Sequence, residues 1–260
     1  MVSLPCPCSH RRVQPWLYAA LHRGHPGDLA FYLAECAGAA TVLELGVGYG
    51  RLAVPLAAAG HVVTGVDIEP ELLAAAAVRR DAASPEVRRR LSLLEGDMTA
   101  LELGRRFDRV LIPYSGLHCL LDDVSLRRCL QRVVQHLRPD GRLIFDTYLA
   151  DDLHHDPEAE EGETEPEAIV ELELEGRRYV VEEQVRWQRR AQRLDTTYRA
   201  AADDGSEPIE QHIPQRYLLL DELERALAEA GMTVAEAYGD FDRRPLTPAS
   251  ELRVVVAELS

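Results

Sequence analysis

The sequence predicts an α/β protein with a largely parallel sheet, because short apolar runs alternate with helical segments over its first 150 residues. Two further observations indicate where this sheet binds a ligand. Gly46, Gly48 and Gly50 follow the first apolar run at alternate positions, and Asp67 ends the second run. Ligands of parallel sheets gather at the carboxyl ends of the strands, so we expect these residues to form a site at one edge.

Length and composition limit the classes of function. The chain has 260 residues, 46% of them hydrophobic, which fits one large domain or a domain with an insertion. Its net charge of −15 disfavours nucleic acid as a partner, because binding to phosphates needs concentrated Lys and Arg. No apolar run approaches a membrane span, and the first ten residues lack the features of a secretory signal. We therefore expect a cytoplasmic protein without a membrane partner.

The cysteines indicate neither a disulfide framework nor a complete metal site. Five cysteines occur without regular spacing, which predicts reduced thiols. Cys6, Cys8 and His10 lie close together and form part of a ligand set. Because a structural zinc site normally needs four well-spaced ligands, we expect no metal.

The first 150 residues are expected to form two helices and then alternating strands and helices. Both initial helices fall within 11–36 and are separated by a break at 24–27. The expected strands are 41–45, 61–67, 90–95, 107–114 and 142–147. The expected intervening helices are 51–59, 69–80 and 126–137, and a turn at 138–141 ends the last of them.

The pattern changes after residue 150. Residues 151–168 are acidic and poor in apolar side chains, which predicts a flexible surface loop. Alternation of period two then predicts three or four antiparallel strands up to residue 217, with a hairpin turn at Glu175 and Gly176. The residues expected to share one face are Tyr179, Val181, Val185 and Trp187. Pro214 predicts that the last of these strands is an edge strand.

A final helix at 220–230 and two strands at 232–239 and 251–258 close the chain. We therefore divide it into three parts. The first, 1–150, holds the N-terminal helices and the ligand-binding core. The second, 151–218, is an inserted acidic loop and antiparallel sheet, and the third, 219–260, completes the core.

The glycine turn fits either a dinucleotide or a nucleoside with a sulfonium group. Its alternate glycines differ from the Gly-x-Gly-x-x-Gly spacing on which a pyrophosphate settles. Asp67 suits both ligands, because a carboxylate accepts hydrogen bonds from ribose hydroxyls. Gly96, Asp97 and Met98 follow the third strand, where an acid can accept from the adenine amine while a thioether packs on the ring.

Together these motifs resemble the class I S-adenosylmethionine-dependent methyltransferases. Glu44 to Gly50 is similar to their first motif, and residues 107–114 are similar to their fourth-strand motif. The resemblance implies a Rossmann-like seven-stranded sheet with helices on both faces and an inserted small antiparallel sheet. It implies S-adenosyl-L-methionine as the cofactor and S-adenosyl-L-homocysteine as its product.

The resemblance also implies roles for individual residues. Gly46, Gly48 and Gly50 would approach the methionine and ribose portions of the cofactor. Asp67, with the neighbouring Ile68, would bind the ribose. The residues implied for the rest of the cofactor site are Glu44 in the first motif, Asp97 and Met98 beside the adenine, and Tyr18 and Arg23 at the methionine carboxylate.

Four further residues are candidates for the acceptor side. His118 leaves the fourth strand and could act as a general base or orient the acceptor, because its ordinary pKa lies near neutrality. The alternative is that His118 caps a turn or faces solvent. Tyr114, Tyr148 and Arg216 are candidates for the pocket wall, and packing roles are the alternative for Tyr148 and Arg216.

We expect an enzyme that transfers a methyl group to a small molecule by in-line displacement, with an amine nitrogen favoured over a hydroxyl or thiol. The inserted sheet resembles the small sheet of glycine, amino-sugar and peptide-amine N-methyltransferases, where it covers the pocket or builds a homodimer. The alternatives are a peptide or protein N-methyltransferase and a non-catalytic cofactor-binding protein. Ile112-Pro-Tyr-Ser lacks the Asn/Asp-Pro-Pro-aromatic motif of nucleic-acid methyltransferases. The sequence does not identify the acceptor or the oligomeric state.

Overall fold

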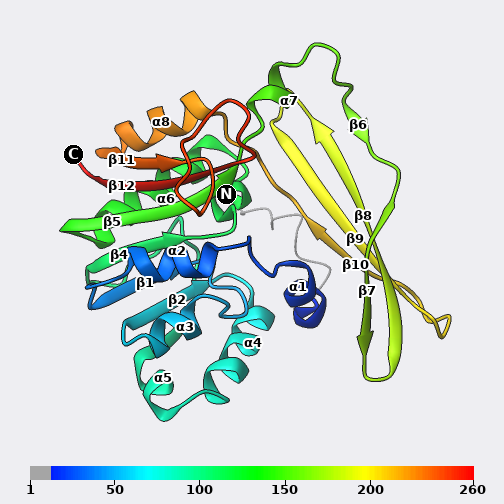
Figure 1. The fold of residues 1–260 in the computed structure, drawn as a ribbon, viewed down its shortest axis with the longest axis horizontal. Helices are drawn as coiled ribbons and strands as arrows, with labels where there is room; N and C mark the ends of the chain where they lie inside the picture. The colour runs from blue at the N-terminus through cyan, green and yellow to red at the C-terminus, as the bar shows by residue number, and fades with distance from the viewer. Residues whose placement is uncertain (1–12) are drawn as a thin grey trace, which may run out of the picture.

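A computed structural model describes residues 13–260, so Cys6, Cys8 and His10 lie outside the described residues. The described part begins with two short helices and then alternates strands and helices, as predicted (Figure 1). The elements of this first part are α1 Pro15–Leu21, α2 Asp28–Glu35, β1 Thr41–Leu45, α3 Ala53–Ala58, β2 Val62–Asp67, α4 Pro70–Asp81, α5 Pro85–Arg90, β3 Leu91–Glu95, β4 Phe107–Ile112, the 3₁₀ helix η1 Gly116–Cys119, α6 Asp123–His136 and β5 Leu137–Tyr148.

The later elements form the inserted sheet and then return to the core. They are α7 Asp151–His155, β6 Gly162–Glu163, β7 Glu167–Leu174, β8 Arg177–Gln188, β9 Arg193–Ala202, β10 Ile209–Ile213, α8 Leu220–Glu229, β11 Met232–Tyr238 and β12 Leu252–Leu259. Among the residues that the structure describes, no helix is long and apolar enough to cross a membrane.

The core is a seven-stranded sheet with the strand order β11-β12-β5-β4-β1-β2-β3. Strands β1 to β5 are parallel to one another, whereas β12 is antiparallel to both β5 and β11. Helices α6 and α8 pack their apolar residues against one face, and α2 and α3 pack theirs against the other. This arrangement confirms the predicted Rossmann-like sheet with helices on both faces, and it aligns the carboxyl ends of β1 to β5 at one edge.

Several predicted boundaries of the core were wrong. Residues 85–90 form the helix α5, which was not predicted, because Ser84 caps it, Pro85 begins it and Val87 is buried beneath it. Strand β5 begins at Leu137 rather than at residue 142, because Phe107 of β4 pairs with Leu137 and the register then shifts to Arg109 and Arg142. The expected turn at 138–141 is therefore an irregularity within the strand.

The inserted sheet has five strands rather than the three or four that were expected. Part of the predicted flexible loop is ordered, because β6 pairs with Trp187 and Arg186 of β8 and residues 151–155 form α7. Glu175 and Gly176 have φ angles of 51° and 78°, as a tight hairpin turn requires. Strand β10 is an edge strand and ends directly before Pro214, as predicted.

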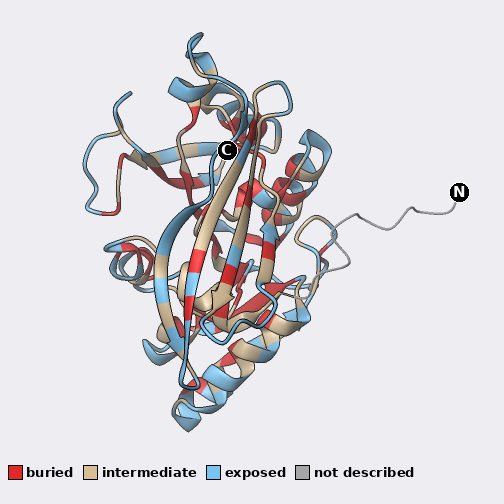
Figure 2. Cartoon of the chain, turned by 90° about the vertical axis from the view of Figure 1, so that its right-hand side faces the viewer, coloured by how far each residue is buried: buried red, intermediate tan, exposed pale blue. Residues whose placement is uncertain are grey.

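The inserted sheet stands beside the carboxyl edge of the core, and α1 lies between the two (Figure 1). Leu17 of α1 is buried against Tyr179, Val181 and Ala200 of the inserted sheet. Seen from outside, the long strands of this sheet cross in front of the core and show intermediate and exposed residues along much of their length (Figure 2). We call the side that faces α1 and the core the inner face of the inserted sheet.

Candidate active site

The glycine loop between β1 and α3 forms the centre of the site. Gly46, Gly48 and Gly50 have φ angles of 71°, 54° and 77°, which disfavour any residue with a side chain. The amide groups of Gly46 and Val47 both donate to the carbonyl oxygen of Val66 at 2.9 Å, so the loop is fixed across the end of β2. An added Cβ at Gly48 would lie 3.6 Å from the ring of Tyr18 and would fill the space between the loop and α1.

Asp67 ends β2 directly beside this loop. Its Oδ2 accepts from the amide of Gly48 at 2.7 Å, and its Oδ1 accepts from the amide of Glu69 at 3.0 Å. Burial raises the pKa of this carboxyl group above its ordinary value, although these backbone hydrogen bonds oppose the shift. The next residue, Ile68, is 62% exposed and offers an apolar surface at the same edge.

The third predicted point of the site follows β3. Asp97 is exposed, and its Oδ1 accepts from the amide of Thr99 at 2.7 Å, which fixes the turn. Met98 packs against the apolar core beneath that turn. The structure therefore places an acid and a thioether next to each other at the carboxyl edge, two strands away from β1.

Glu44 of β1 is a buried acid beneath the glycine loop. Burial raises its pKa to about 8, and the nearby positive charge of Arg51 opposes that shift. Within residues 13–260, its Oε2 has no hydrogen-bond partner. This group therefore retains an unused position for a donor at the base of the site.

The two residues predicted on the N-terminal helices, Tyr18 and Arg23, lie within α1 and just after its end. Tyr18 lies over Gly48 and stacks on His22 with ring centroids 4.0 Å apart. Arg23 is exposed, its Nε donates to the carbonyl oxygen of Ala20 at 2.8 Å, and its positive charge acts on the phenol of Tyr49 in the glycine loop, where it opposes the rise in the pKa of that phenol. The predicted contact of Arg23 with the methionine carboxylate of the cofactor stays a prediction, and Arg23 lies two residues beyond the end of α1 at Leu21.

Arg51 is a cation near the loop that was not predicted as a site residue. Its Nη1 lies 2.7 Å from Oδ2 of Asp28, and an added Cβ at Gly24 would lie only 2.2 Å from the same nitrogen. Its guanidinium group also lies 5.7 Å from the ring centroid of Tyr114. The signal was available in the sequence, because Arg51 directly follows the last glycine of the loop.

Asp146 at the end of β5 organises the chain that leaves β4. Its carboxylate accepts from the hydroxyl of Tyr32 at 2.6 Å and from the amides of Tyr114 and Ser115 at 2.8 Å and 3.1 Å. Tyr114 and Ser115 have positive φ angles of 56° and 54°, an uncommon conformation for such residues. The buried carboxylate therefore holds a strained segment in place, a role that was not predicted although an acid at a strand end was visible in the sequence.

An aromatic cluster joins α1, the end of β4 and the inserted sheet. The ring of His22 meets Tyr114 edge-on at 5.7 Å and Tyr198 of β9 edge-on at 6.0 Å. His25 adds a second ring against Tyr114 at 4.9 Å. The structure thus brings the predicted Tyr114 together with Tyr198, which sequence reasoning missed because their separation along the chain is large.

His118 does not have the surroundings of a general base. Its side chain is 0% exposed, and neither ring nitrogen has a hydrogen-bond partner in the described part of the chain. Burial and the nearby charge of Arg216 lower its pKa to about 3. Its ring lies 4.2 Å from that of Tyr148, whose buried hydroxyl also lacks a partner among residues 13–260. The structure therefore disagrees with the predicted base and places a neutral imidazole beneath Tyr148.

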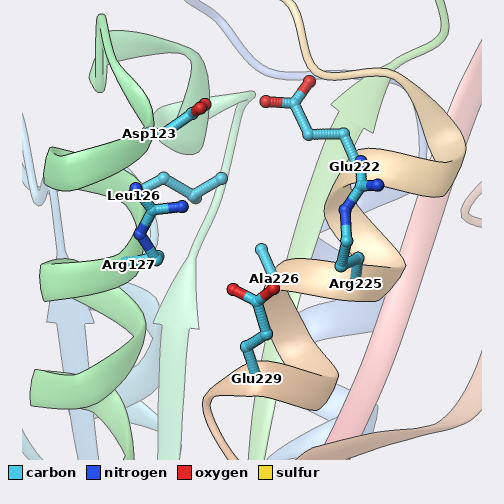
Figure 3. A pocket seen from close by; sticks show the side chains of 7 residues that line it. All are labelled: Asp123, Leu126, Arg127, Glu222, Arg225, Ala226 and Glu229. Carbon is cyan, nitrogen blue, oxygen red and sulfur yellow. The ribbon is translucent and has the colours of Figure 1, made fainter.

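Arg216 is held by ion pairs rather than presented to an acceptor. Its Nη2 lies 2.7 Å from Asp123 of α6 and also pairs with Glu222 of α8. These two acids line a small pocket of about 140 Å³ between the helices (Figure 3). The other lining residues are Leu126, Arg127, Arg225, Ala226 and Glu229, and none of them is a residue of the glycine loop or the aromatic cluster.

Comparison with known proteins identifies the family. Residues 42–141 match the methyltransferase domain family. A Geobacillus sp. (strain WCH70) protein named as a methyltransferase is 29% identical over 225 residues, which are 85% of each chain. The dTDP-3-amino-3,6-dideoxy-α-D-glucopyranose N,N-dimethyltransferase of Streptomyces fradiae is 29% identical over 51% of this chain and 52% of its own. The structure of the CcbJ methyltransferase from Streptomyces caelestis has a TM-score of 0.77 and 27% identity, covering 91% of this chain and 97% of that one.

The residues described above fit S-adenosylmethionine, the cofactor of this fold. Other methyltransferase structures with the same fold contain S-adenosylmethionine, S-adenosylhomocysteine or sinefungin. Here, the space that a side chain on Gly48 would fill, the fixed carboxylate of Asp67 and the exposed Asp97 lie along one edge of the sheet. S-Adenosylmethionine is therefore the cofactor, and the chain is a class I S-adenosylmethionine-dependent methyltransferase.

Proposed function

We propose that this enzyme methylates the amine nitrogen of a small molecule of the amino-sugar class. The observation that carries the proposal is the contact of Tyr198 with His22, which in turn contacts Tyr114, because it brings the inserted sheet to the end of β4. An acceptor beside Tyr114 is thereby bounded by the inserted sheet, as suits a small molecule. The relatives whose names state an acceptor are methyltransferases of an amino-sugar nucleotide, an amino pentose and a glycopeptide.

When bound, S-adenosylmethionine supplies an activated methyl group for in-line displacement. The residues of the chain contribute alignment, which is worth roughly 7–11 kcal/mol in well-oriented reactions. Asp146 fixes the backbone of Tyr114 and Ser115, and Tyr18 covers the glycine loop. The glycine loop and the backbone beside Tyr114 are therefore fixed before the cofactor binds.

An amine acceptor suits a site without a strong base. A neutral amine attacks with its own lone pair, and the proton released from the methylated nitrogen passes to solvent. A hydroxyl acceptor needs a base, and His118, with its pKa lowered to about 3 and its ring buried, cannot efficiently remove that proton near neutral pH. The chemistry of His118 thus favours the amine over the hydroxyl.

The test compares matched acceptors. Purified enzyme is mixed with methyl-labelled cofactor and with pairs of sugars that differ only by an amine or a hydroxyl at one carbon, and the product masses are measured. We expect methylation of amines and little of the matched alcohols. Transfer only to alcohols or thiols, or no transfer by a protein that binds S-adenosylhomocysteine, would contradict the proposal.

A glycopeptide or peptide amine is the second candidate, supported by the fold shared with a glycopeptide N-methyltransferase. A peptide library and a metabolite panel, assayed side by side, separate the two acceptors. Methylated peptides in the absence of methylated amino sugars would favour this second function.

A further inference from the structure

The inner face of the inserted sheet is interrupted by polar residues. Along β8, Tyr179, Val181 and Trp187 are buried on this face. Glu183 lies on the same face, directly after Val181 in the alternation, where an apolar residue would continue the pattern. Glu183 pairs with Tyr198 of β9, and Tyr198 pairs with Gln211 of β10. We call Glu183, Tyr198 and Gln211 the polar row.

The polar row faces the core. Directly paired residues of neighbouring strands project from the same side of a sheet, and so do residues two apart on one strand. The adjacent pair, Val181 and Ala200, packs on Leu17 of α1, which lies between the sheet and the core (Figure 1). Tyr198 itself reaches His22, which contacts Tyr114 at the end of β4. The polar row therefore lies on the same face of the inserted sheet as the aromatic cluster of His22, His25, Tyr114 and Tyr198.

The side-chain oxygen of Gln211 is a hydrogen-bond acceptor without a donor in the described chain. The residue is only 5% exposed, and its Oε1 has no hydrogen-bond partner among residues 13–260. A buried polar atom without a partner is costly, so ligand donors are favoured there. Two residues along β9 from Tyr198, Thr196 is also buried on this face.

The charge at the other end of the row is negative. Burial raises the pKa of Tyr198, and the negative charge of Glu183, to which Tyr198 donates a hydrogen bond, raises this pKa further. The phenol therefore remains a neutral donor while the carboxylate retains its remaining acceptor positions. Carboxylate and amide oxygens attract ammonium, N–H and O–H groups and repel anions.

We propose that Glu183, Tyr198 and Gln211 form the acceptor-recognition subsite, which binds a hydroxylated amine in its neutral form through an N–H group on Glu183, leaving the nitrogen lone pair free, and through an O–H or N–H group on Gln211. This inference rests on the proposed function and adds the residues that select the acceptor. It assigns recognition to the inserted sheet and leaves the cofactor to the core. The acceptor class that fits is a donor-rich amino sugar rather than a thiol or a carboxylate-bearing metabolite.

The test uses Glu183→Gln and Gln211→Leu, with Glu182→Gln as the matched control. Glu182 is the neighbouring acid on the opposite face of β8, where it pairs with Arg199 at 3.1 Å. The probes are amino sugars, headed by dTDP-3-amino-3,6-dideoxyglucose, and their hydroxyl counterparts. Binding to the complex with S-adenosylhomocysteine is measured by calorimetry, and methyl transfer by product mass.

We expect Glu183→Gln to raise the Kd and KM of the amine about 10- to 100-fold and to reduce the preference for the amine over the matched alcohol. Gln211→Leu should raise the Kd of the amine about 3- to 10-fold without lowering thermal stability, because it removes an unpartnered oxygen. Both variants should bind S-adenosylhomocysteine as wild type does, which excludes misfolding. Glu182→Gln should match wild type.

The outcomes separate this inference from the proposed function. If wild type methylates an amino sugar and both variants bind it normally, the subsite is wrong and the function stands. If wild type binds S-adenosylhomocysteine but neither binds nor methylates any amine, both the function and the subsite are wrong. An amine preference that persists in Glu183→Gln would also overturn the subsite.

Discussion

The carboxyl edge of the core and the inner face of the inserted sheet differ in whether their buried polar side chains have hydrogen-bond partners within the protein. At the core edge, Asp67 is fixed by two backbone amides and Asp146 by two amides and a hydroxyl. On the inner face of the inserted sheet, Gln211 keeps a buried oxygen without a partner in the described chain. The carboxylates of the predicted cofactor site are therefore fixed by the fold, whereas the proposed acceptor subsite leaves an oxygen free for a ligand.

This difference explains how one core can serve several acceptors. The hydrogen bonds at the core edge connect the glycine loop to β2, and they do not involve the inserted sheet. If the proposed subsite is correct, changes on β8 to β10 should alter the acceptor while the cofactor site is kept. The following predictions test this separation, from the largest expected effect to the smallest.

Replacing Asp67 should have the largest effect, and it should fall on the cofactor. Asp67→Ala removes the acceptor of the Gly48 and Glu69 amides as well as the proposed ribose contact. We expect the Kd for S-adenosylhomocysteine to rise about 100-fold or more, since hydrogen bonds to charged groups are worth about 1.5–3 kcal/mol each. Calorimetry measures this, with the exposed Glu95→Ala as the control. A Kd within about threefold of wild type would contradict the assigned role.

Replacing Asp146 should destabilise the protein as well as slow methyl transfer. Asp146→Asn leaves one carbonyl oxygen for three donors and turns an amide toward Tyr114 or Ser115. We expect a loss of about 2–4 kcal/mol in the free energy of unfolding, measured with urea, and a lower kcat. Asp140→Asn, at an exposed position, is the control. Unchanged stability would show that the carboxylate does not hold the strained segment.

Glu44 should make stability depend on pH. Its pKa is about 8 in the folded protein against an ordinary 4.5, so between these values the folded chain keeps a proton that the unfolded chain releases. The stabilising contribution of Glu44 is therefore full below 4.5 and is lost as the pH rises through about 8. Urea unfolding should show wild type losing stability relative to Glu44→Gln between about pH 5 and pH 8, by up to about 1.4 kcal/mol per unit. A constant difference across that range would refute the buried, protonated state.

Replacing His118 should have the smallest effect. His118→Leu removes two buried nitrogens without partners and keeps an apolar side chain against Tyr148. We expect kcat/KM to fall less than about tenfold, whereas loss of a general base costs about 10²–10⁴-fold. Steady-state measurement of kcat/KM distinguishes a packing residue from a general base. A fall of the larger size would restore His118 as the base and would contradict its role as a packing residue.

The parts predicted from sequence are those set by local pattern. The glycine loop, Asp67 and the turn at Asp97 follow apolar strands at fixed offsets, so both the sheet and the cofactor could be inferred. The helix α5 was missed because its short run of three arginines resembles a solvated surface. The position of Arg23 near the end of a helix does not show where its long side chain points, so its predicted contact with the methionine carboxylate could not be fixed from sequence.

The acceptor side depended on contacts between distant segments. Glu183 interrupts an apolar face that was recognised in the sequence, but its pairing with Tyr198 and Gln211 needs the register of three strands. The burial of His118 likewise depends on Tyr148 and on the Arg216 segment, which lie far along the chain. Residue type and spacing give no direct information on such long-range packing.

Amide hydrogen exchange, measured with S-adenosylhomocysteine alone and then with an amino-sugar acceptor added, tests the separation of the two regions most directly. We predict that S-adenosylhomocysteine slows exchange at 46–50 and 67–69, and that the acceptor further slows exchange at 181–185 and 209–213. Acceptor-dependent protection at the pocket between α6 and α8 (Figure 3), with none on the inserted sheet, would contradict the account.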